Sequence, residues 1–263
     1  MNKYLVIGNP IEHSLSPKLH NFWIKVNNLD AIYEKKKLNE NQLADLILEI
    51  KKKNIHGINV TVPFKKVVIP YLDKLTFESD STQSVNTIHL QDNKLVGHNT
   101  DIEGFERSIQ DLKLDLINKK ALVLGAGGVV PSIIFALNKM KVSEVIISNR
   151  TKSKAENLKY LFRNIKIVEW GEIPEFDIII NATSVGLKNE DKMNLDISKV
   201  GKNKFFYDVI YKPSETNFLK VGKKLGNKTE NGKMMFIYQA QGAFKMWHGI
   251  QPIINQEVIK ILD

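Results

Sequence analysis

Cysteine is absent from the 263-residue chain, which excludes disulfide bonds and thiolate chemistry. The chain also lacks an apolar run of about eighteen residues, so no membrane-spanning helix is expected. The N-terminus, MNKYLVIGNP, lacks the apolar segment of a signal peptide and predicts a short strand ending in a turn. We therefore expect a cytoplasmic protein, and the length allows one large or two modest domains.

The residue patterns of two kinds of chemistry are also missing. No group of histidine, aspartate and glutamate residues has the spacing of metal ligands, so we predict no metal. No GxSxG or comparable nucleophile motif is present, which argues against a hydrolase. His13 stands between Glu12 and Ser14 without a partner pattern, which favours a structural role.

The chain is basic, with a net charge of +9 from 38 basic and 29 acidic residues. Its lysine runs, such as Lys35–Lys37 and Lys51–Lys53, abut predicted helices and are spread along the chain, as on solvated faces. No basic stripe is interleaved with aromatic residues, so nucleic-acid binding is not expected. The charge is compatible with a field that attracts anionic substrates.

Strand and helix patterns alternate along most of the chain, which predicts mostly parallel α/β sheets. The first predicted elements are strands at 3–8, 31–38 and 56–62, helices at 17–26 and 40–53, and a hairpin of 84–90 with 94–99 around Asp92-Asn93. The apolar face of the helix at 17–26 is expected to consist of Leu19, Phe22, Trp23 and Val26. That of the helix at 40–53 is expected to consist of Leu43, Leu46, Ile47 and Ile50.

A second α/β unit is predicted after a helix at 101–112. Its elements are a strand, glycine turn and helix at 119–140, and strands at 144–150, 166–170, 177–183 and 204–210. The last segment, from Met235, predicts an amphipathic helix lined by Phe236, Ala240, Ala243, Phe244 and Trp247. We expect one domain of residues 1–101 plus 236–263, and another of residues 102–235.

The stretch ALVLGAGGVVPS has the order strand, glycine turn and helix, which is typical of a dinucleotide site. Gly125 would allow the tight turn, and Gly127 would let the backbone approach a pyrophosphate at the helix N-terminus. Pro131 suits the first helical turn, while Val130 stands where the third glycine of the motif would be. A purely structural turn is the alternative.

The end of the next predicted strand indicates which dinucleotide binds. EVIISNRTKSK carries Asn149 and Arg150 at its tip, with Lys152 and Lys154 behind them, and no carboxylate. A carboxylate there would bind the ribose 2′-hydroxyl of NAD, whereas a guanidinium matches a phosphate. The sequence therefore predicts NADP as the cofactor, and a solvated strand end is the alternative.

Nine stretches occur in order along residues 8–244: GNPIEHSLSP, NVTVPFK, SVNT, GHNTD, GAGG, NRT, NATSVG, YDVIY and YQAQGAF. Together they resemble the shikimate dehydrogenase family. The resemblance implies a substrate-binding α/β domain and a Rossmann-like NADP-binding domain with a cleft between them. It also implies reversible reduction of 3-dehydroshikimate to shikimate with NADPH, in aromatic amino-acid biosynthesis. The expected partner is this small molecule, and a homodimer is left open.

The resemblance implies a role for each matching residue. Lys65 and Asp101 are the expected catalytic pair, with Lys65 as the proton donor and acceptor or as an electrostatic donor to the developing oxyanion. The other expected substrate residues are Ser14, Ser16 and Tyr211 for the carboxylate, and Asn59, Thr61, Asn86 and Gln239, with Asp101, for ring hydroxyls. The expected cofactor residues are Gly125, Ala126, Gly127, Gly128, Val129, Asn149, Arg150, Thr151, Lys154, Thr183, Val209 and Gly232.

Several of these residues also fit local structural roles. Ser16 and Asp101 stand where a helix N-cap would stand, and Val209 and Gly232 would suit a core strand and a turn. Three alternative functions remain: a quinate/shikimate dehydrogenase of broader specificity, a non-catalytic NADP-binding sensor of the same fold, and a nucleic-acid-binding module. The sensor would be expected to have lost Lys65 or Asp101, and both are present.

Overall fold

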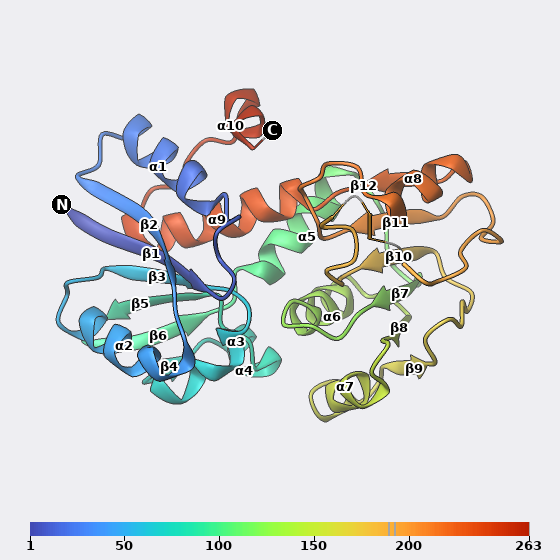
Figure 1. The fold of residues 1–263 in the computed structure, drawn as a ribbon, viewed down its shortest axis with the longest axis horizontal. Coiled ribbons are helices and arrows are strands. Elements are labelled where there is room, and N and C mark those ends of the chain that lie inside the picture. The colour runs from blue at the N-terminus through green and yellow to red at the C-terminus, as the bar shows by residue number, and fades with distance from the viewer. Residues whose placement is uncertain (189, 192, 263) are drawn as a thin grey trace. The chain divides into compact units, whose positions relative to one another are not determined.

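The structure is a computed structural model that describes residues 1–188, 190–191 and 193–262. It divides into two compact units, Met1–Gly104 with Ile237–Asp263, and Phe105–Phe236. The two points of division fall inside helices α5 (Asp101–Asp111) and α9 (Lys233–His248), so each of these helices contributes residues to both units (Figure 1).

The first unit contains a six-stranded sheet in the order β2-β1-β3-β5-β6-β4. Its strands are β1 (Asn2–Gly8), β2 (Ala31–Lys37), β3 (Gly57–Val60), β4 (Lys74–Leu75), β5 (Thr87–Gln91) and β6 (Lys94–His98). The expected hairpin is confirmed, since Asp92 and Asn93 have φ of 49° and 59° and join antiparallel β5 and β6. A two-residue turn can only reverse the chain, so this sheet is mixed, with β5 antiparallel to both of its neighbours. The pairs β1–β2, β1–β3 and β4–β6 are parallel, so the expectation of a mostly parallel sheet is confirmed.

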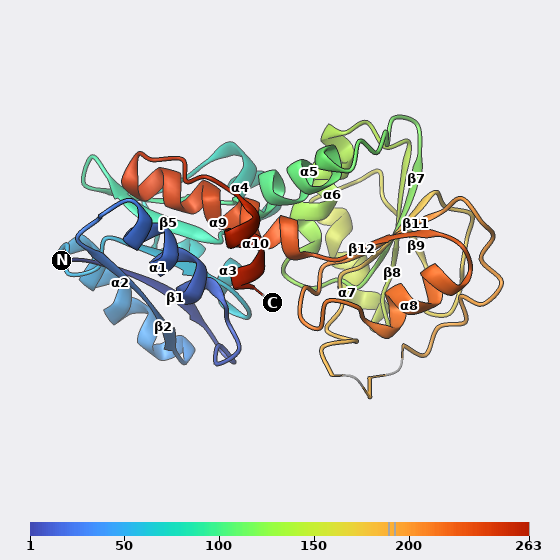
Figure 2. The same cartoon turned by 90° about the horizontal axis from the view of Figure 1, so that it is seen from above.

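The two faces of the first sheet follow from the alternation of side chains along its strands. Leu5, Ile7 and Ile58 form a core with α2 (Leu43–Lys51). The opposite face carries Tyr4, Tyr33 and Asn59 and packs against α1 (Ser16–Val26) and α9. Figure 1 shows α2 on one side of the sheet and α1 with α9 on the other, and Figure 2 shows α1 and α9 side by side over it.

Three sequence-based details of this unit need correction. Val26 is 59% exposed because the buried stripe of α1 runs through Leu19 and Trp23 and ends before the last residue of the helix. Strand β3 ends at Val60, so Thr61 lies beyond it rather than on it. The expected helix at 40–53 begins with a 3₁₀ turn, Glu40–Gln42, and is α-helical only over Leu43–Lys51.

The second unit contains a fully parallel sheet in the order β12-β11-β10-β7-β8-β9. Its strands are β7 (Lys120–Leu124), β8 (Glu144–Ser148), β9 (Lys166–Val168), β10 (Ile178–Asn181), β11 (Phe205–Asp208) and β12 (Lys228–Glu230). Read from β9 to β12, this is the 3-2-1-4-5-6 order of a dinucleotide-binding sheet. The order reverses between β7 and β10, where such sheets bind ligands at the carboxyl ends of the strands.

Helices cover both faces of the second sheet. Helix α8 (Asn217–Lys224) packs on Phe206, and a Cβ on Gly222 would lie 2.6 Å from that ring. Tyr207, on the opposite face, contacts Phe105 and Ser108 of α5. The remaining α-helices are α3 (Phe64–Val67), α4 (Phe77–Thr82), α6 (Val130–Lys139), α7 (Lys152–Asn157) and α10 (Gln256–Ile261). Within the described chain, no helix is both long and apolar enough to cross a bilayer.

Candidate active site

Lys65 and Asp101 form an ion pair in the first unit. Lys65 lies on α3, just after β3, and Asp101 is the first residue of α5, just after β6. The main-chain N–H of Val85 donates to the Lys65 carbonyl at 2.8 Å, which ties α3 to the segment before β5. The side chains of Lys65 and Asp101 are only 12% and 9% exposed. Lys66, in contrast, is exposed to solvent, as expected.

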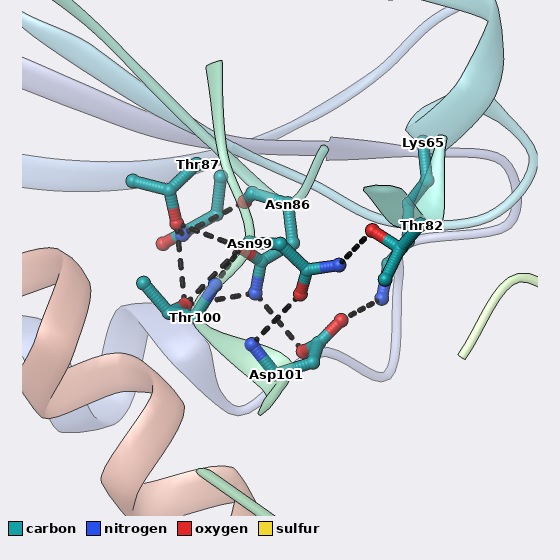
Figure 3. A network of polar contacts seen from close by, with 8 residues as sticks. Lys65, Thr82, Asn86, Thr87, Asn99, Thr100 and Asp101 are labelled. Carbon is teal, nitrogen blue, oxygen red and sulfur yellow. Dashed lines mark hydrogen bonds and ion pairs between the residues drawn. The ribbon is translucent and has the colours of Figure 1, made fainter. Parts of the chain in front are cut away.

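Asn86 holds the carboxylate of this pair in place (Figure 3). Its Nδ2 donates to Asp101 Oδ1 and to Thr100 Oγ1, both at 2.9 Å. Its Oδ1 accepts from the Thr100 main-chain N–H at 2.8 Å, and this contact fixes which end of the amide is oxygen. Asp101 therefore receives Lys65 on one oxygen and Asn86 on the other.

The network continues from Asn86 to Asn59 on β3. Asn59 Nδ2 donates to the Asn86 carbonyl at 3.1 Å and to Thr87 Oγ1 at 3.0 Å. Asn59 Oδ1 accepts from the Tyr33 hydroxyl at 2.6 Å. Asn59 and Asn86 are 6% and 3% exposed, so these polar groups are satisfied inside the protein rather than by solvent.

This arrangement can supply or accept a proton at one fixed point. The Lys65 ammonium is a donor, and the neutral amine is an acceptor in the reverse direction. Asn86 holds the Asp101 carboxylate by a hydrogen bond, and Asp101 holds the Lys65 amine by an ion pair. Together they restrict where the amine can lie. Breaking such a partly buried pair by removing one partner costs about 3–5 kcal/mol, since the other charge is left uncompensated.

In the second unit, the glycine turn after β7 lies against the loop after β10. Gly125 has φ +113°, and a Cβ there would lie 2.9 Å from the Ala182 carbonyl oxygen and 3.2 Å from Thr183 Cγ2. Only glycine fits this conformation and this close approach. Two of the expected cofactor segments, GAGG and NATSVG, therefore meet at the carboxyl edge of the sheet.

The rest of the turn is open. Gly127 and Gly128 are exposed, and the nearest atom to a Cβ on Gly127 would be 4.0 Å away. Ala126 and Val129 are half-buried, and α6 starts at Val130 with Pro131 in its first turn, as expected. Exposed backbone at a helix N-terminus fits a pyrophosphate, which needs N–H donors and room for close approach.

The end of β8 presents cations to solvent. Arg150, Thr151 and Lys154 are exposed, and Asn149 is half-buried and donates to the Thr151 carbonyl at 2.7 Å. Lys152 is paired with Glu169, whereas no salt bridge of Arg150 or Lys154 is found among the described residues. Arg150 and Lys154 therefore keep their charges available for a phosphate.

Thr183 is held by a buried polar group. The Thr183 main-chain N–H and hydroxyl donate to Asn181 Oδ1 at 3.1 and 2.7 Å, and Asn181 Nδ2 donates to both Asp208 oxygens at 3.1 Å. Burial raises the pKa of Asp208 to about 6, although hydrogen bonds from Thr216, Ile210 and Asn181 act in the opposite direction.

Val209 and Gly232 lie directly against each other. A Cβ on Gly232 would be 2.2 Å from the Val209 carbonyl oxygen, so glycine is required at this contact. These two expected cofactor residues are therefore in contact with each other in the second unit.

Two family models match this chain. Residues 6–88 match the model described as the shikimate dehydrogenase substrate binding domain, and residues 107–210 match the model described as shikimate / quinate 5-dehydrogenase. Over 260 residues, the chain is 58% identical to the shikimate dehydrogenase (NADP(+)) of Pelagibacter ubique (strain HTCC1062), covering 99% of this chain and 98% of that protein. The chain belongs to the shikimate dehydrogenase family.

Solved structures agree with this assignment. The crystal structure of shikimate dehydrogenase from Aquifex aeolicus superposes with a TM-score of 0.92 at 37% identity, covering 100% of this chain and 97% of that one. The shikimate 5-dehydrogenase of Thermus thermophilus, in complex with NADP(H) and shikimate, gives 0.90 at 30% identity, covering 100% and 98%. The resemblance inferred from the motifs and the two-domain α/β fold class are therefore confirmed.

The residues that match the carboxylate-binding positions of the family belong to both units: Ser14 and Ser16 to the first, and Tyr211 to the second. Ser16 is the first residue of α1, whose N-cap is Leu15 without a side-chain cap, so the N-cap alternative for Ser16 is wrong. The Ser16 main-chain N–H donates to Ser14 Oγ at 3.3 Å. Tyr211 belongs to the second unit, where its ring stacks on Phe236 at 4.5 Å.

The remaining matching positions are Thr61 and Gln239, both half-buried in the first unit. The Thr61 main-chain N–H donates to the Ile7 carbonyl at 2.9 Å, so its backbone follows β1 although β3 has ended. Gln239 lies on α9, between buried neighbours, and is not a fully exposed helix position. Within the described part of the chain, no three metal-ligating side chains are grouped as a metal site.

Five residues that hold the expected site residues were not predicted from the sequence: Tyr33, Thr87, Thr100, Asn181 and Asp208. Thr87, Thr100 and Asn181 stand inside the quoted motifs SVNT, GHNTD and NATSVG, so the motifs were the signal. Asp208 stands in YDVIY. Tyr33 lies in an ordinary strand pattern, AIYEKKKL, and had no signal.

Proposed function

We propose that this chain is an NADP-dependent shikimate dehydrogenase that interconverts 3-dehydroshikimate and shikimate. The observation that carries the proposal is the ion pair of Lys65 with Asp101, held by Asn86 in a buried network, in a chain of this family. The expected NADP dependence agrees with the names of the relatives, which include NADP(+).

Hydride addition to the carbonyl carbon of the ketone would leave an alkoxide oxygen, which needs a proton. When bound, NADPH supplies the hydride. Lys65 then gives a proton to the oxygen of the new alcohol, and it takes that proton back when shikimate is oxidised. Asp101 orients the Lys65 amine and compensates its charge, and Asn86 keeps the carboxylate from turning away.

We propose the substrate contacts by the chemistry of each group. The carboxylate would bind to hydroxyl donors, and the ring hydroxyls to amide and carboxylate groups. The proposed contacts are Ser14, Ser16 and Tyr211 for the carboxylate, and Asn59, Thr61, Asn86, Asp101 and Gln239 for the ring.

The proposed cofactor contacts follow the edge of the parallel sheet. The exposed glycine turn at the start of α6 would hold the pyrophosphate, and the cations after β8 would hold the 2′-phosphate. The nicotinamide end would lie near the loops after β10 and β11. The proposed residues are Gly125, Ala126, Gly127, Gly128, Val129, Asn149, Arg150, Thr151, Lys154, Thr183, Val209 and Gly232.

Absorbance at the NADPH band tests the proposal directly. The purified chain is mixed with shikimate and NADP⁺ or NAD⁺, and quinate replaces shikimate in parallel. We expect a rise with shikimate and NADP⁺, and a slower rise with NAD⁺. A flat trace with all substrates, from protein that binds NADP⁺, would contradict an enzymatic role and favour the sensor.

A quinate/shikimate dehydrogenase is the second candidate. It is supported by the description of the model matched by residues 107–210, which names both substrates. Quinate and shikimate are similar enough that a pocket rejects one added hydroxyl poorly. Comparable kcat/KM values for quinate and shikimate would favour this candidate.

Three further expectations remain proposals. The first unit would be the substrate domain and the second the NADP domain, a cytoplasmic location is expected, and the oligomeric state is open to a homodimer. Light scattering on the eluting protein would distinguish a monomer of 30.0 kDa from a dimer.

A further inference from the structure

One buried hydroxyl group contacts a proposed substrate residue. Tyr33 is 1% exposed, and its hydroxyl donates to Asn59 Oδ1 at 2.6 Å. Its ring is fixed as well, because it stacks on His20 with centroids 4.1 Å apart and planes 6° from parallel. Neither the ring nor the hydroxyl can move without disturbing this packing.

The chemistry of the partners determines which atom donates in each hydrogen bond of Asn59. The atom of Asn59 that faces the Asn86 carbonyl must be the nitrogen, because a carbonyl only accepts. The oxygen of Asn59 therefore faces Tyr33, and the single Tyr33 proton goes to it. Burial raises the pKa of Tyr33 well above its usual value, so this proton stays in place across the physiological range.

These directions determine what Asn59 can offer to a ligand. Both amide protons are used, on the Asn86 carbonyl and on Thr87 Oγ1. Asn59 Oδ1 has two lone pairs, and one accepts from Tyr33. One lone pair remains, so Asn59 can accept from a hydroxyl but cannot donate to a carbonyl or carboxylate.

We propose that Tyr33 is a positioning residue of the substrate site. Tyr33 holds the Asn59 amide so that Asn59 Oδ1 accepts a hydrogen bond from a ring hydroxyl of the substrate. The proposal rests on the proposed function. Tyr33 does not act on the reacting atoms; it acts through Asn59, and so affects substrate recognition more than proton transfer.

The Tyr33→Phe variant tests this proposal, because it removes one oxygen and keeps the stacked ring. We expect KM for shikimate to rise about 5- to 30-fold, the loss of one buried hydrogen bond, with kcat within about twofold and KM for NADP⁺ unchanged. Tyr4→Phe is the matched control: Tyr4 is 3% exposed in the same aromatic cluster and is not a proposed site residue. It should keep the wild-type KM for shikimate.

Two measurements separate positioning from a structural effect. Shikimate analogues that each lack one ring hydroxyl should reveal one analogue whose kcat/KM is the same in Tyr33→Phe and in the wild type. The Asn59→Ala variant should lose most of the response to Tyr33→Phe, a non-additive pair. An equal loss on shikimate and every analogue would overturn the proposal, as would a Tyr33→Phe KM equal to that of Tyr4→Phe.

The wild-type assay keeps the two proposals apart. Absence of shikimate-dependent NADPH formation by wild-type protein would remove the proposed function itself. An active wild type with a Tyr33→Phe variant that behaves like the control would remove only the role of Tyr33.

Discussion

The two units build their candidate sites from different materials. In the first unit the site consists of buried side chains: Asn59, Asn86 and Asp101 are all buried and are hydrogen-bonded in series. In the second unit it consists largely of exposed backbone and solvent-facing cations, such as Gly127 and Arg150.

The difference follows from what each unit is proposed to bind. A small ring with several hydroxyls can be distinguished only by directional donors and acceptors that are held rigidly. A pyrophosphate is satisfied by main-chain N–H groups at a helix N-terminus, where side chains would be in the way. Substitutions should therefore affect the first unit through lost hydrogen bonds and the second through added atoms or lost charge.

The largest effect should come from the charge pair of the first unit. Lys65→Met removes the ammonium and keeps most of the side-chain volume, and kcat should fall about 10²- to 10⁴-fold because proton transfer is lost. NADPH formation in steady state measures this, with NADP⁺ binding as the folding control. Lys66→Met, at the exposed neighbour, should stay near wild type. Equal losses in both variants would contradict the role of Lys65.

In the second unit, alanine substitutions of two glycines in one turn should have different effects, one on stability and the other on cofactor binding. Gly125→Ala should lower the free energy of unfolding by about 2–3 kcal/mol, because φ is +113° and the methyl group would meet the Ala182 carbonyl. Gly127→Ala should leave stability within about 0.5 kcal/mol and weaken NADP⁺ binding instead. Denaturant unfolding and NADP⁺ titration measure the two effects. A stable Gly125→Ala variant would refute the strain argument.

The cations after β8 should govern the choice of cofactor. Arg150→Ala should lower the preference for NADP⁺ over NAD⁺ about 10- to 100-fold, the loss of a charge-assisted hydrogen bond to the 2′-phosphate. The ratio of kcat/KM for the two cofactors measures it. Lys152→Ala is the control, because Lys152 is already paired with Glu169. An unchanged ratio in Arg150→Ala would assign the selection to another residue.

The smallest effect concerns the pH dependence of stability, through the buried His20 that stacks on Tyr33 in the first unit. Burial, and secondarily the charge of His248, lower the pKa of His20 to about 3. The unfolded chain therefore binds a proton at His20 below about pH 6.5 and the folded chain does not, so stability falls as pH falls. Between pH 7 and 5 the wild type should lose roughly 2 kcal/mol more than His20→Phe. Unfolding at both pH values measures this.

The exposed His13 provides the comparison for that experiment, and His13→Phe should keep the wild-type pH profile. Identical pH dependence in wild type and His20→Phe would mean that the buried imidazole is protonated in the folded protein as easily as in water.

Much of the fold was predictable because local patterns report local structure. The stripe of Leu43, Leu46, Ile47 and Ile50 is buried as expected, and Asp92-Asn93 forms the predicted turn. Val26 and Thr61 were misplaced because periodicity does not mark where an element ends. Strand β12 and helices α7 and α8 were not anticipated, since their apolar patterns are short.

The sequence by itself determined the two α/β units, the glycine turn and the types of residue at the candidate site, because these depend on neighbours along the chain. Only the tertiary structure decided which polar groups pair. Tyr33 and Asn59 are 26 positions apart, and Lys65 and Asp101 are 36 apart. Their contacts depend on the order and register of β2, β1, β3 and β5 and on burial that excludes water, neither of which is present in any local stretch of sequence.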